Sequence, residues 1–291
     1  MSQPSRPAVQ FSAPLRWPGG LGLPRLIATD LDGTLTRPDG SISPRAAQAL
    51  AAVSAAGSRV LLVTGRPVRW LVRVYADLPE PYPAVCANGA VLFDPVADAI
   101  VSAHVIPADD LRRSTDALRA ELPDVTFAAE TDGGRRMLHE AAYPILFDPD
   151  DPDIASATLA EICSVPAVKL LVRATGWDPD ELTAAVRSVV GDGLEATHSS
   201  RSGLVELSAA GVTKATGLAA YAGGLGLGPA DVLVFGDMPN DLPMFAWADG
   251  RAVAVANAHP AVLAAAGDVT AANTEDGVAA YLERLLDTGV C

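Results

Sequence analysis

Two aspartates two positions apart are the residues whose types and spacing point most directly to chemistry. Asp30 and Asp32 lie in the segment DLDGT, which follows the apolar residues 25–29. Two neighbouring carboxylates that are both ionised need a counter-charge, and Mg²⁺, which prefers oxygen ligands, can supply it. A simple turn is the alternative, because Asp, Gly and Thr are common loop residues. The position at the end of a buried strand favours a site for a divalent cation.

A threonine and a glycine follow the second apolar run, residues 59–63. The Thr64 hydroxyl and the backbone N–H of Gly65 would lie at the carboxyl end of that strand, on the same sheet edge as DLDGT. Donors at such an edge can hold phosphate oxygens. Alone, the pair is more typical of an ordinary turn, so it indicates phosphate binding only because of its position at this sheet edge.

A third polar segment, GDMPND at residues 236–241, follows the apolar residues 231–235. Asp237 can complete the oxygen ligands of a cation, and Asn240 adds an amide at the same edge. The alternative is that one of them caps the helix that follows. Lys214 lies at the start of an earlier helix, where the helix dipole disfavours a positive charge. An anionic cluster beside the lysine would compensate for that placement.

The elements that must position these residues form an alternating pattern of strands and helices. Apolar runs without polar alternation predict strands buried on both faces, at residues 25–29, 59–63, 231–235 and 251–255. A helix is predicted at residues 43–57, where Ser43 can cap it and Gly57 can end it. Such units imply a parallel sheet, which binds ligands at the carboxyl ends of its strands. We therefore expect an α/β fold with a doubly wound, mostly parallel, Rossmann-like core.

The middle of the chain has a different texture. Short β-like pieces alternate with helical stretches at residues 108–122 and 178–190, which predicts an α+β cap domain inserted into the core. The first residues are rich in proline and are expected to form a flexible tail. The expected division is a tail at residues 1–24, a core at residues 25–88 and 206–291, and a cap at residues 89–205.

The composition excludes several classes of partner. With 21 lysines and arginines against 35 aspartates and glutamates, the net charge is −14, which disfavours binding to nucleic acid or to anionic lipid. The longest apolar candidate, residues 252–266, is broken by polar residues, and we expect neither a membrane span nor a signal peptide. The three cysteines are too scattered for a disulfide framework or a zinc cluster, which favours free thiols in a cytoplasmic protein.

The order of DLDGT, TGR, a lone lysine and GDMPND resembles the haloacid dehalogenase superfamily of phosphotransferases. The long insertion near Gly89, with GVTK, VANA and the late segment NTEDGVAAYLE, is similar to the Cof-type branch, which has a large α/β cap. The match extends over nearly the whole chain from Arg25. Two residues depart from the family pattern: Thr29 stands where a bulky apolar residue is common, and Ala215 where a glycine is common. Both bear on local packing.

The resemblance implies a role for each polar group. Asp30 would be the nucleophile that forms an aspartyl-phosphate, and Asp32 the general acid and base. Mg²⁺ would be bound by the side chains of Asp30 and Asp237 and by the backbone carbonyl of Asp32. Asn240 or Asp241 would support the ion indirectly or through water. The phosphate would be bound by Thr64, Gly65, Lys214 and Asn240.

The cap is expected to close over this edge and to recognise the leaving group. The candidate residues are Arg66 on the core and Arg135, Arg136, His139, Arg173 and Arg201 on the cap. For each of these residues the stronger interpretation is a side chain that does not touch the substrate, because surface arginines are usually solvated. A lone histidine such as His139 or His198 is more often structural.

These observations lead us to expect a Mg²⁺-dependent phosphatase that hydrolyses a small phosphorylated metabolite, with a sugar phosphate favoured by analogy. A phosphomutase or another phosphotransferase of the same superfamily would keep all four segments and is an alternative. A second alternative is a binding or regulatory module without activity. The intact Asp30, Asp32, Lys214 and Asp237 argue against that module. The oligomeric state stays open.

Overall fold

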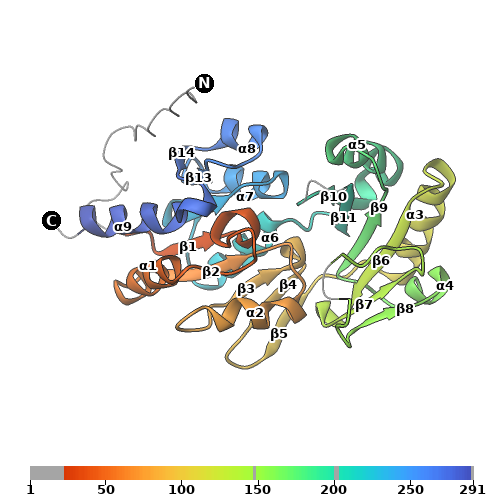
Figure 1. Cartoon of the computed structure of the whole chain (residues 1–291), viewed down its shortest axis with the longest axis horizontal. Helices are drawn as coiled ribbons and strands as arrows, with labels where there is room; N and C mark the ends of the chain where they lie inside the picture. Colours follow the sequence, from red (N-terminus) through yellow and green to blue (C-terminus); the bar gives the residue numbers. More distant parts are fainter. Residues whose placement is uncertain (1–22, 147–148, 200–202, 290–291) are drawn as a thin grey trace, which may run out of the picture.

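The apolar residues before Asp30 form β1 (Leu26–Thr29), in the middle of an eight-stranded sheet (Figure 1). The computed structural model describes residues 23–146, 149–199 and 203–289, so the predicted tail lies almost entirely outside the described residues. β1 pairs in parallel with β2 (Arg59–Val63) and β12 (Val232–Gly236). Every residue of β1 and β12 is buried, as their continuous apolar sequence predicts.

The sheet continues on both sides of these strands in the order β14-β13-β12-β1-β2-β3-β4-β5. The parallel neighbours are β3 (Ala84–Cys86), β13 (Ala252–Val255) and β14 (Asp268–Thr270). The parallel strands place the ends that follow β1, β2 and β12 at one edge. The predicted Rossmann-like, mostly parallel core is therefore confirmed.

Helices cover both faces of this sheet. α1 (Pro44–Ala55) connects β1 to β2, and the Ser43 side chain caps it by accepting a hydrogen bond from the Ala46 N–H at 3.0 Å. α7 (Leu242–Trp247) connects β12 to β13 in the other direction along the sheet, so right-handed crossovers place α1 and α7 on opposite faces. The remaining core helices are α2 (Leu71–Ala76), α6 (Lys214–Gly224), α8 (Pro260–Ala265) and α9 (Gly277–Gly289). Within the described ranges, no helix has both the length and the apolar character needed to cross a membrane.

A second sheet forms the inserted domain, in the order β10-β11-β9-β6-β7-β8. Its strands are β6 (Thr126–Thr131), β7 (Arg136–His139), β8 (Ile154–Ser156), β9 (Lys169–Arg173), β10 (Leu194–Thr197) and β11 (Leu204–Ala209). Its helices are α3 (Ala108–Glu121), α4 (Leu159–Ile162) and α5 (Pro179–Val190). Apolar residues such as Phe127 and Leu170 pack on one face with residues of α3 and α5. The alternate residues, among them Glu130, Lys169 and Glu206, belong to the other face, which lies toward the core domain.

Strand pairing bears on the domain boundaries, which the sequence predicts at residues 88 and 205. β4 (Val91–Asp94) pairs antiparallel with β3, and β5 (Ala99–Ala103) with β4, so the core sheet continues beyond residue 88. β11 belongs to the cap sheet through Ala209, beyond the predicted end at residue 205. The reason is that a short strand does not reveal by its own sequence which sheet it joins. We propose that the cap spans residues 104–209.

Candidate active site

Three strand ends bring the predicted polar residues to one edge of the core sheet. Asp30 follows β1, and its N–H donates to the Phe235 carbonyl at 3.0 Å, so the pairing of β1 with β12 extends to it. Asp237 and Asp241 lie in the turn that follows β12. Each of these three aspartates offers an oxygen within 4.8 Å of the others, and all three are buried. Asp30 and Asp237 are therefore close enough to share a cation, as the sequence predicts.

Lys214 reaches this cluster from the start of α6. Its Nζ donates to Asp30 Oδ1 and to Asp241 Oδ1, both at 2.6 Å, and its side chain is 1% exposed. Gly89 fixes the position of α6, because a Cβ at this residue would lie 1.9 Å from the carbonyl oxygen of Thr213, which caps the helix. The φ of Gly89 is +106°, a value that also favours glycine. This close approach delivers the lysine to the carboxylates.

The charges of the cluster are unequal, with three carboxylates around one ammonium group. Burial raises the pKa of Asp30 to about 7, although Lys214 acts to lower it. Burial, together with Asp30 and Asp241, raises the pKa of Asp237 to about 9. Burial lowers the pKa of Lys214, but the two carboxylates it contacts more than offset this, and its pKa is raised. A further cation would relieve the remaining repulsion, which is the electrostatic condition for binding a divalent metal ion.

The three carboxylates are not equally available to such an ion. Oδ1 of Asp241 accepts from Lys214, and its Oδ2 accepts from the backbone N–H groups of Asp237 and Met238, at 2.8 and 3.0 Å. Asp237 Oδ1 accepts from Thr34 Oγ1 at 3.0 Å. Since one oxygen of Asp241 is engaged by Lys214 and the other by the backbone of the turn, the carboxylates of Asp30 and Asp237 are the ones placed to hold a cation.

Asp32 forms a bidentate ion pair with Arg66 beside this cluster. Arg66 Nε donates to Asp32 Oδ2 at 2.8 Å, and Nη2 donates to Oδ1 at 2.6 Å. The Asp32 side chain is 54% exposed, so it is open to solvent where the aspartate cluster is not. Arg66 was predicted to contact the phosphate or the leaving group, and the structure pairs it with the predicted acid and base.

The backbone next to Asp32 is held from two sides. Gly33 has a φ of +81°, and a Cβ there would lie 2.2 Å from Asp237 Oδ2, so this turn requires glycine. The Gly33 carbonyl accepts from Asn257 Nδ2 at 2.8 Å, and Asn257 Oδ1 accepts from the Asn273 N–H at 2.9 Å. Asn257 and Asn273 belong to the segments VANA and NTEDG, which explains why these stretches accompany DLDGT.

The loop after β2 contains the predicted phosphate-binding groups. Thr64 is buried, and its Oγ1 accepts from the Arg66 N–H at 3.0 Å. Its carbonyl accepts from the Asn88 N–H at 3.1 Å, and Asn88 Oδ1 accepts from Asn240 Nδ2 at 3.0 Å. Asn88 thereby ties the loop after β2 to the loop after β12. The roles of Thr64, Gly65 and Asn240 in binding phosphate stay predictions.

Several cap residues predicted to recognise the leaving group have partners elsewhere. Arg135 donates to the side chain of Asp98, in the turn between β4 and β5, at 2.9 Å. His139 contacts the backbone carbonyl of the next residue through Nδ1 at 2.8 Å. His198 contacts Asp180 Oδ1 at 2.9 Å. These contacts favour the structural interpretation of Arg135, His139 and His198.

The other cap arginines that the sequence singles out differ in what the structure describes of them. The guanidinium of Arg173 lies over the ring of Tyr143, 5.6 Å from its centroid, on the cap face that lies toward the core. Arg136 is exposed to solvent. Arg201 lies outside the described residues. Arg173 is buried on the face of the cap sheet that lies toward the core.

Four charged residues that sequence reasoning missed join the cap to the core edge. Lys169 on β9 donates to the Gly65 carbonyl and to Glu206 Oε1, the latter at 2.5 Å. In the other direction, Arg69 of the core binds Glu130 of β6. All four charged side chains are almost fully buried. The signal that could have found two of them is a charged residue inside an apolar strand, as in VKLLVR and LVELS.

The two departures from the family pattern are accommodated locally. Thr29 is buried in β1, and its Oγ1 donates to the Asp30 carbonyl at 2.8 Å. Ala215 is partly buried and packs against the core of the larger domain. Neither substitution displaces Asp30 from Lys214.

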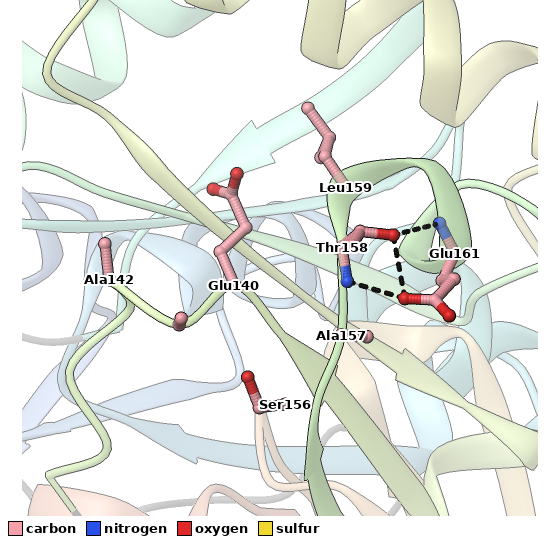
Figure 2. Close-up of a pocket in the computed structure, with 8 residues that line it drawn as sticks. Glu140, Ala142, Ser156, Ala157, Thr158, Leu159 and Glu161 are labelled. Carbon is pink, nitrogen blue, oxygen red and sulfur yellow. Dashed lines mark hydrogen bonds between the residues drawn. The ribbon is translucent and has the colours of Figure 1, made fainter.

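A hollow of about 530 Å³ on the cap is separate from this site (Figure 2). It is lined by Glu140, Ala141, Ala142, Ser156, Ala157, Thr158, Leu159 and Glu161. Thr158 and Glu161 bind each other at the start of α4, and Glu140 binds Arg119 at 2.7 Å. Its carboxylates are therefore used within the cap, and the core edge that carries Asp30 and Asp237 is the candidate site.

The sequence matches a protein-family model, the haloacid dehalogenase-like hydrolases, over residues 27–282. The chain therefore belongs to this family. The interpretation drawn from the motifs, a haloacid dehalogenase superfamily phosphatase of the Cof type, is confirmed.

Two named relatives are similar over nearly the whole chain. One is the 5-amino-6-(5-phospho-D-ribitylamino)uracil phosphatase YitU of Bacillus subtilis (strain 168), 29% identical over 89% of this chain and 97% of that protein. The other is the pyridoxal phosphate phosphatase YbhA of Escherichia coli (strain K12), also 29% identical over 89% and 97%. Among solved structures, SMU.1108c from Streptococcus mutans UA159 matches with a TM-score of 0.80 at 21% identity. This match covers 90% of this chain and 99% of that one, and it supports the fold.

Proposed function

We propose that this chain is a Mg²⁺-dependent phosphomonoester hydrolase that acts through an aspartyl-phosphate on Asp30. The observation that carries the proposal is the buried cluster of Asp30, Asp237 and Asp241 around Lys214, at the carboxyl ends of parallel strands. A structural ion pair needs no excess of carboxylates. A site that binds a cation together with a phosphoryl group does need such an excess.

The metal ion would be held by the carboxylates of Asp30 and Asp237 and by the backbone carbonyl of Asp32. When bound, a divalent cation lowers the repulsion between an anionic nucleophile and a dianionic phosphate ester. Lys214 contributes a second positive charge at the same carboxylate, since it donates to Asp30 at 2.6 Å. This contact favours the ionised form of Asp30, which is the nucleophilic form.

Asp30 would attack the phosphorus in line, forming an O–P bond while the bond to the leaving oxygen breaks. Asp32 would give a proton to the leaving oxygen and would later accept one from the water that hydrolyses the aspartyl-phosphate. Its bidentate pair with Arg66 fixes the orientation of the Asp32 carboxylate. The oxygens of the transferring group would be held by fixed donors on Thr64, Gly65 and Lys214.

The leaving group that we propose is small and polyhydroxylated, as in a sugar phosphate. Two buried ion pairs lie where the cap meets the core, Arg69 with Glu130 and Lys169 with Glu206. Because each cation has its own carboxylate, this boundary offers little net charge to a second anionic group, and neutral hydroxyl groups suit it better. The names of the two relatives differ in their substrates, a ribitylamino uracil phosphate and pyridoxal phosphate, so family membership alone does not select the leaving group.

The test is a panel of phosphorylated metabolites assayed for free phosphate, with Mg²⁺ and with EDTA. We expect phosphate to be released from sugar phosphates without any acceptor, and the release to stop in EDTA. An isomeric sugar phosphate in place of free phosphate would instead show a phosphomutase. Ligand binding without turnover across the whole panel would show a binding module and refute the proposal.

A further inference from the structure

A lysine of the cap is hydrogen-bonded to the phosphate-binding loop of the core. Lys169 opens strand β9, and its Nζ donates to the backbone carbonyl of Gly65. The lysine side chain is 2% exposed. Desolvating an ammonium group to this degree is costly, and a buried ion pair adds little stability by itself. The placement of Lys169 against a core loop therefore points to a role in function.

The peptide group that Lys169 binds is the one that orients Thr64. The Gly65 carbonyl and the Arg66 N–H belong to the same peptide, and this N–H donates to Thr64 Oγ1 at 3.0 Å. A charge-assisted bond to the carbonyl polarises the peptide and strengthens its N–H as a donor. Because the hydroxyl oxygen of Thr64 accepts this bond, its hydrogen is directed to another acceptor, such as a phosphate oxygen. Lys169 thus acts on Thr64 through one peptide.

Two cap residues hold the lysine in this place. Glu206 Oε1 accepts from Lys169 at 2.5 Å, and Glu206 Oε2 accepts from Ser199 Oγ at 2.6 Å. Both residues also pack directly on Gly65, because a Cβ at this glycine would lie 3.6 Å from Glu206 Oε1 and 3.6 Å from Ser199 Oγ. The polar atoms of the cap and the loop therefore meet at Gly65, and the loop and the cap constrain each other.

A second buried ion pair crosses the same boundary at a different place. Arg69 of the core binds Glu130 of β6, and its Nε lies 3.3 Å from Asp151 Oδ2. Its charges and burial resemble those of Lys169 and Glu206. The described hydrogen bonds of Arg69 go to Glu130 and Met137 of the cap and not to the Gly65 peptide. This pair therefore provides a matched control for contact between the domains.

We infer that Lys169 is a positioning residue for phosphoryl transfer. With the cap on the core edge, its ammonium group binds the Gly65 carbonyl and completes the loop that holds the phosphate. The inference rests on the proposed function, which assigns phosphate to Thr64 and Gly65. It concerns the phosphate, which all substrates share, so the loss of Lys169 weakens binding equally whatever the leaving group.

The test compares Lys169→Met/Glu206→Gln, in which neither partner is left as an unpaired buried charge, with Arg69→Met/Glu130→Gln. Binding of inorganic phosphate in the presence of Mg²⁺ is measured by calorimetry, which needs no turnover. The values of kcat and KM are measured with para-nitrophenyl phosphate and with one alkyl phosphate.

We expect the Lys169 double variant to bind phosphate about tenfold more weakly, with an equal loss of kcat/KM for both esters. The Arg69 double variant should bind phosphate within about twofold of the wild type. Lys169→Arg restores a cation that can reach the carbonyl, and it should recover most of the affinity. Thermal melting checks that each variant folds. If the Lys169 double variant does not fold, the comparison is repeated with Lys169→Gln, which is a smaller change.

Three outcomes would overturn the inference. Unchanged phosphate binding in the Lys169 variants would show that the lysine does not act on the loop. Equal weakening in both double variants would show that contact between the domains is enough. A loss that differs between the two esters, with phosphate binding intact, would assign Lys169 to the leaving group. The proposed function is refuted by a different result, in which the wild type binds phosphate but hydrolyses no ester of the panel. In that case the comparison of phosphate affinities still decides the role of Lys169.

Discussion

Two groups of buried charged residues differ in charge balance. One is the set of carboxylates at the core edge, and the other lies where the cap meets that edge. Asp30, Asp237 and Asp241 share one cation, Lys214. At the cap boundary, Glu206 has Lys169 and Glu130 has Arg69. The first arrangement needs a charge from outside the chain, whereas the second is complete in itself. Burial alone therefore does not mark the active site, and the unmatched charge does.

The pKa values follow the same difference. Burial acts to raise the pKa of Glu206, but Lys169 and the hydrogen bonds to this carboxyl outweigh it, and the pKa is lowered. Burial raises the pKa of Asp30 to about 7, and the neighbouring charge of Asp241 adds to the rise, although Lys214 acts to lower it. Glu130 differs from Glu206, since burial raises its pKa despite the contact with Arg69. Burial and the local balance of charges together therefore set the direction of each pKa shift.

The largest expected effect is the loss of the nucleophile at the core edge. Asp30→Asn should lower kcat by roughly 10⁴-fold or more, because an amide cannot form the aspartyl-phosphate. Free phosphate released from para-nitrophenyl phosphate measures it. Asp287→Asn, an exposed change on α9, is the control and should keep wild-type activity. Activity of Asp30→Asn close to that of the control would disprove the assignment.

Removing the shared cation should be the next largest effect. Lys214→Met leaves three buried carboxylates without a counter-charge, and kcat should fall by about 10²- to 10³-fold. In EDTA the free energy of unfolding should fall by about 3–5 kcal/mol, measured by urea denaturation. Lys214→Arg keeps the charge and should recover most of the stability. A Lys214→Met protein as stable as the wild type in EDTA would contradict the proposed electrostatics.

A smaller effect is expected for one ligand of the metal ion. Asp237→Asn removes one negative charge but keeps one oxygen, so the affinity for Mg²⁺ should fall by about 10- to 100-fold. Rates measured over a series of Mg²⁺ concentrations should approach a common maximum when Mg²⁺ is in large excess. The assignment of Asp237 fails if the variant and the wild type need the same Mg²⁺ concentration.

The unbalanced cluster should also make stability depend on pH when no metal is bound. A carboxyl group whose pKa is higher in the folded than in the unfolded state stabilises the fold at low pH, and this contribution is lost as the pH rises through the folded pKa. For Asp30 and Asp237 that window lies between the ordinary value of 3.8 and about 7 and 9. Melting temperatures in EDTA should therefore fall between pH 5.5 and pH 8.5, by a few degrees. Mg²⁺ should raise the melting temperature more at pH 8.5, and an equal gain at both pH values would count against a cation site here.

The smallest effect is expected where the charges are balanced. Arg69→Met/Glu130→Gln replaces a buried ion pair by neutral groups and takes a cation only from Asp151, which is more exposed than Glu130, so the free energy of unfolding should change by only about 1 kcal/mol. Urea denaturation at neutral pH measures it. Arg69→Met alone leaves Glu130 buried without its partner and should cost about 3–5 kcal/mol. If the double variant is as unstable as the single one, the balance inferred for this boundary is wrong.

Local sequence was enough to find the residues at the core edge. Asp30, Thr64 and Asp237 each follow an apolar run that is buried on both faces, and the carboxyl ends of parallel strands must share an edge. Lys214 could be found because its place at a helix start is unfavourable without nearby carboxylates. These inferences depend on short stretches of chain and on one general rule of sheet topology.

The tertiary structure alone decided which sheet the short strands join and which cap residues contact the core. β4 and β5 extend the core sheet, although their sequences fit the cap as well. The reason is that the pairing of a strand depends on its neighbours in the fold and not on its own sequence alone. The contact of Lys169 with Gly65 joins residues 104 positions apart in two domains. No local pattern specifies such a contact, since it depends on how the two domains dock. The sequence thus located the residues of the candidate site, and the docking of the cap determined which further residues surround it.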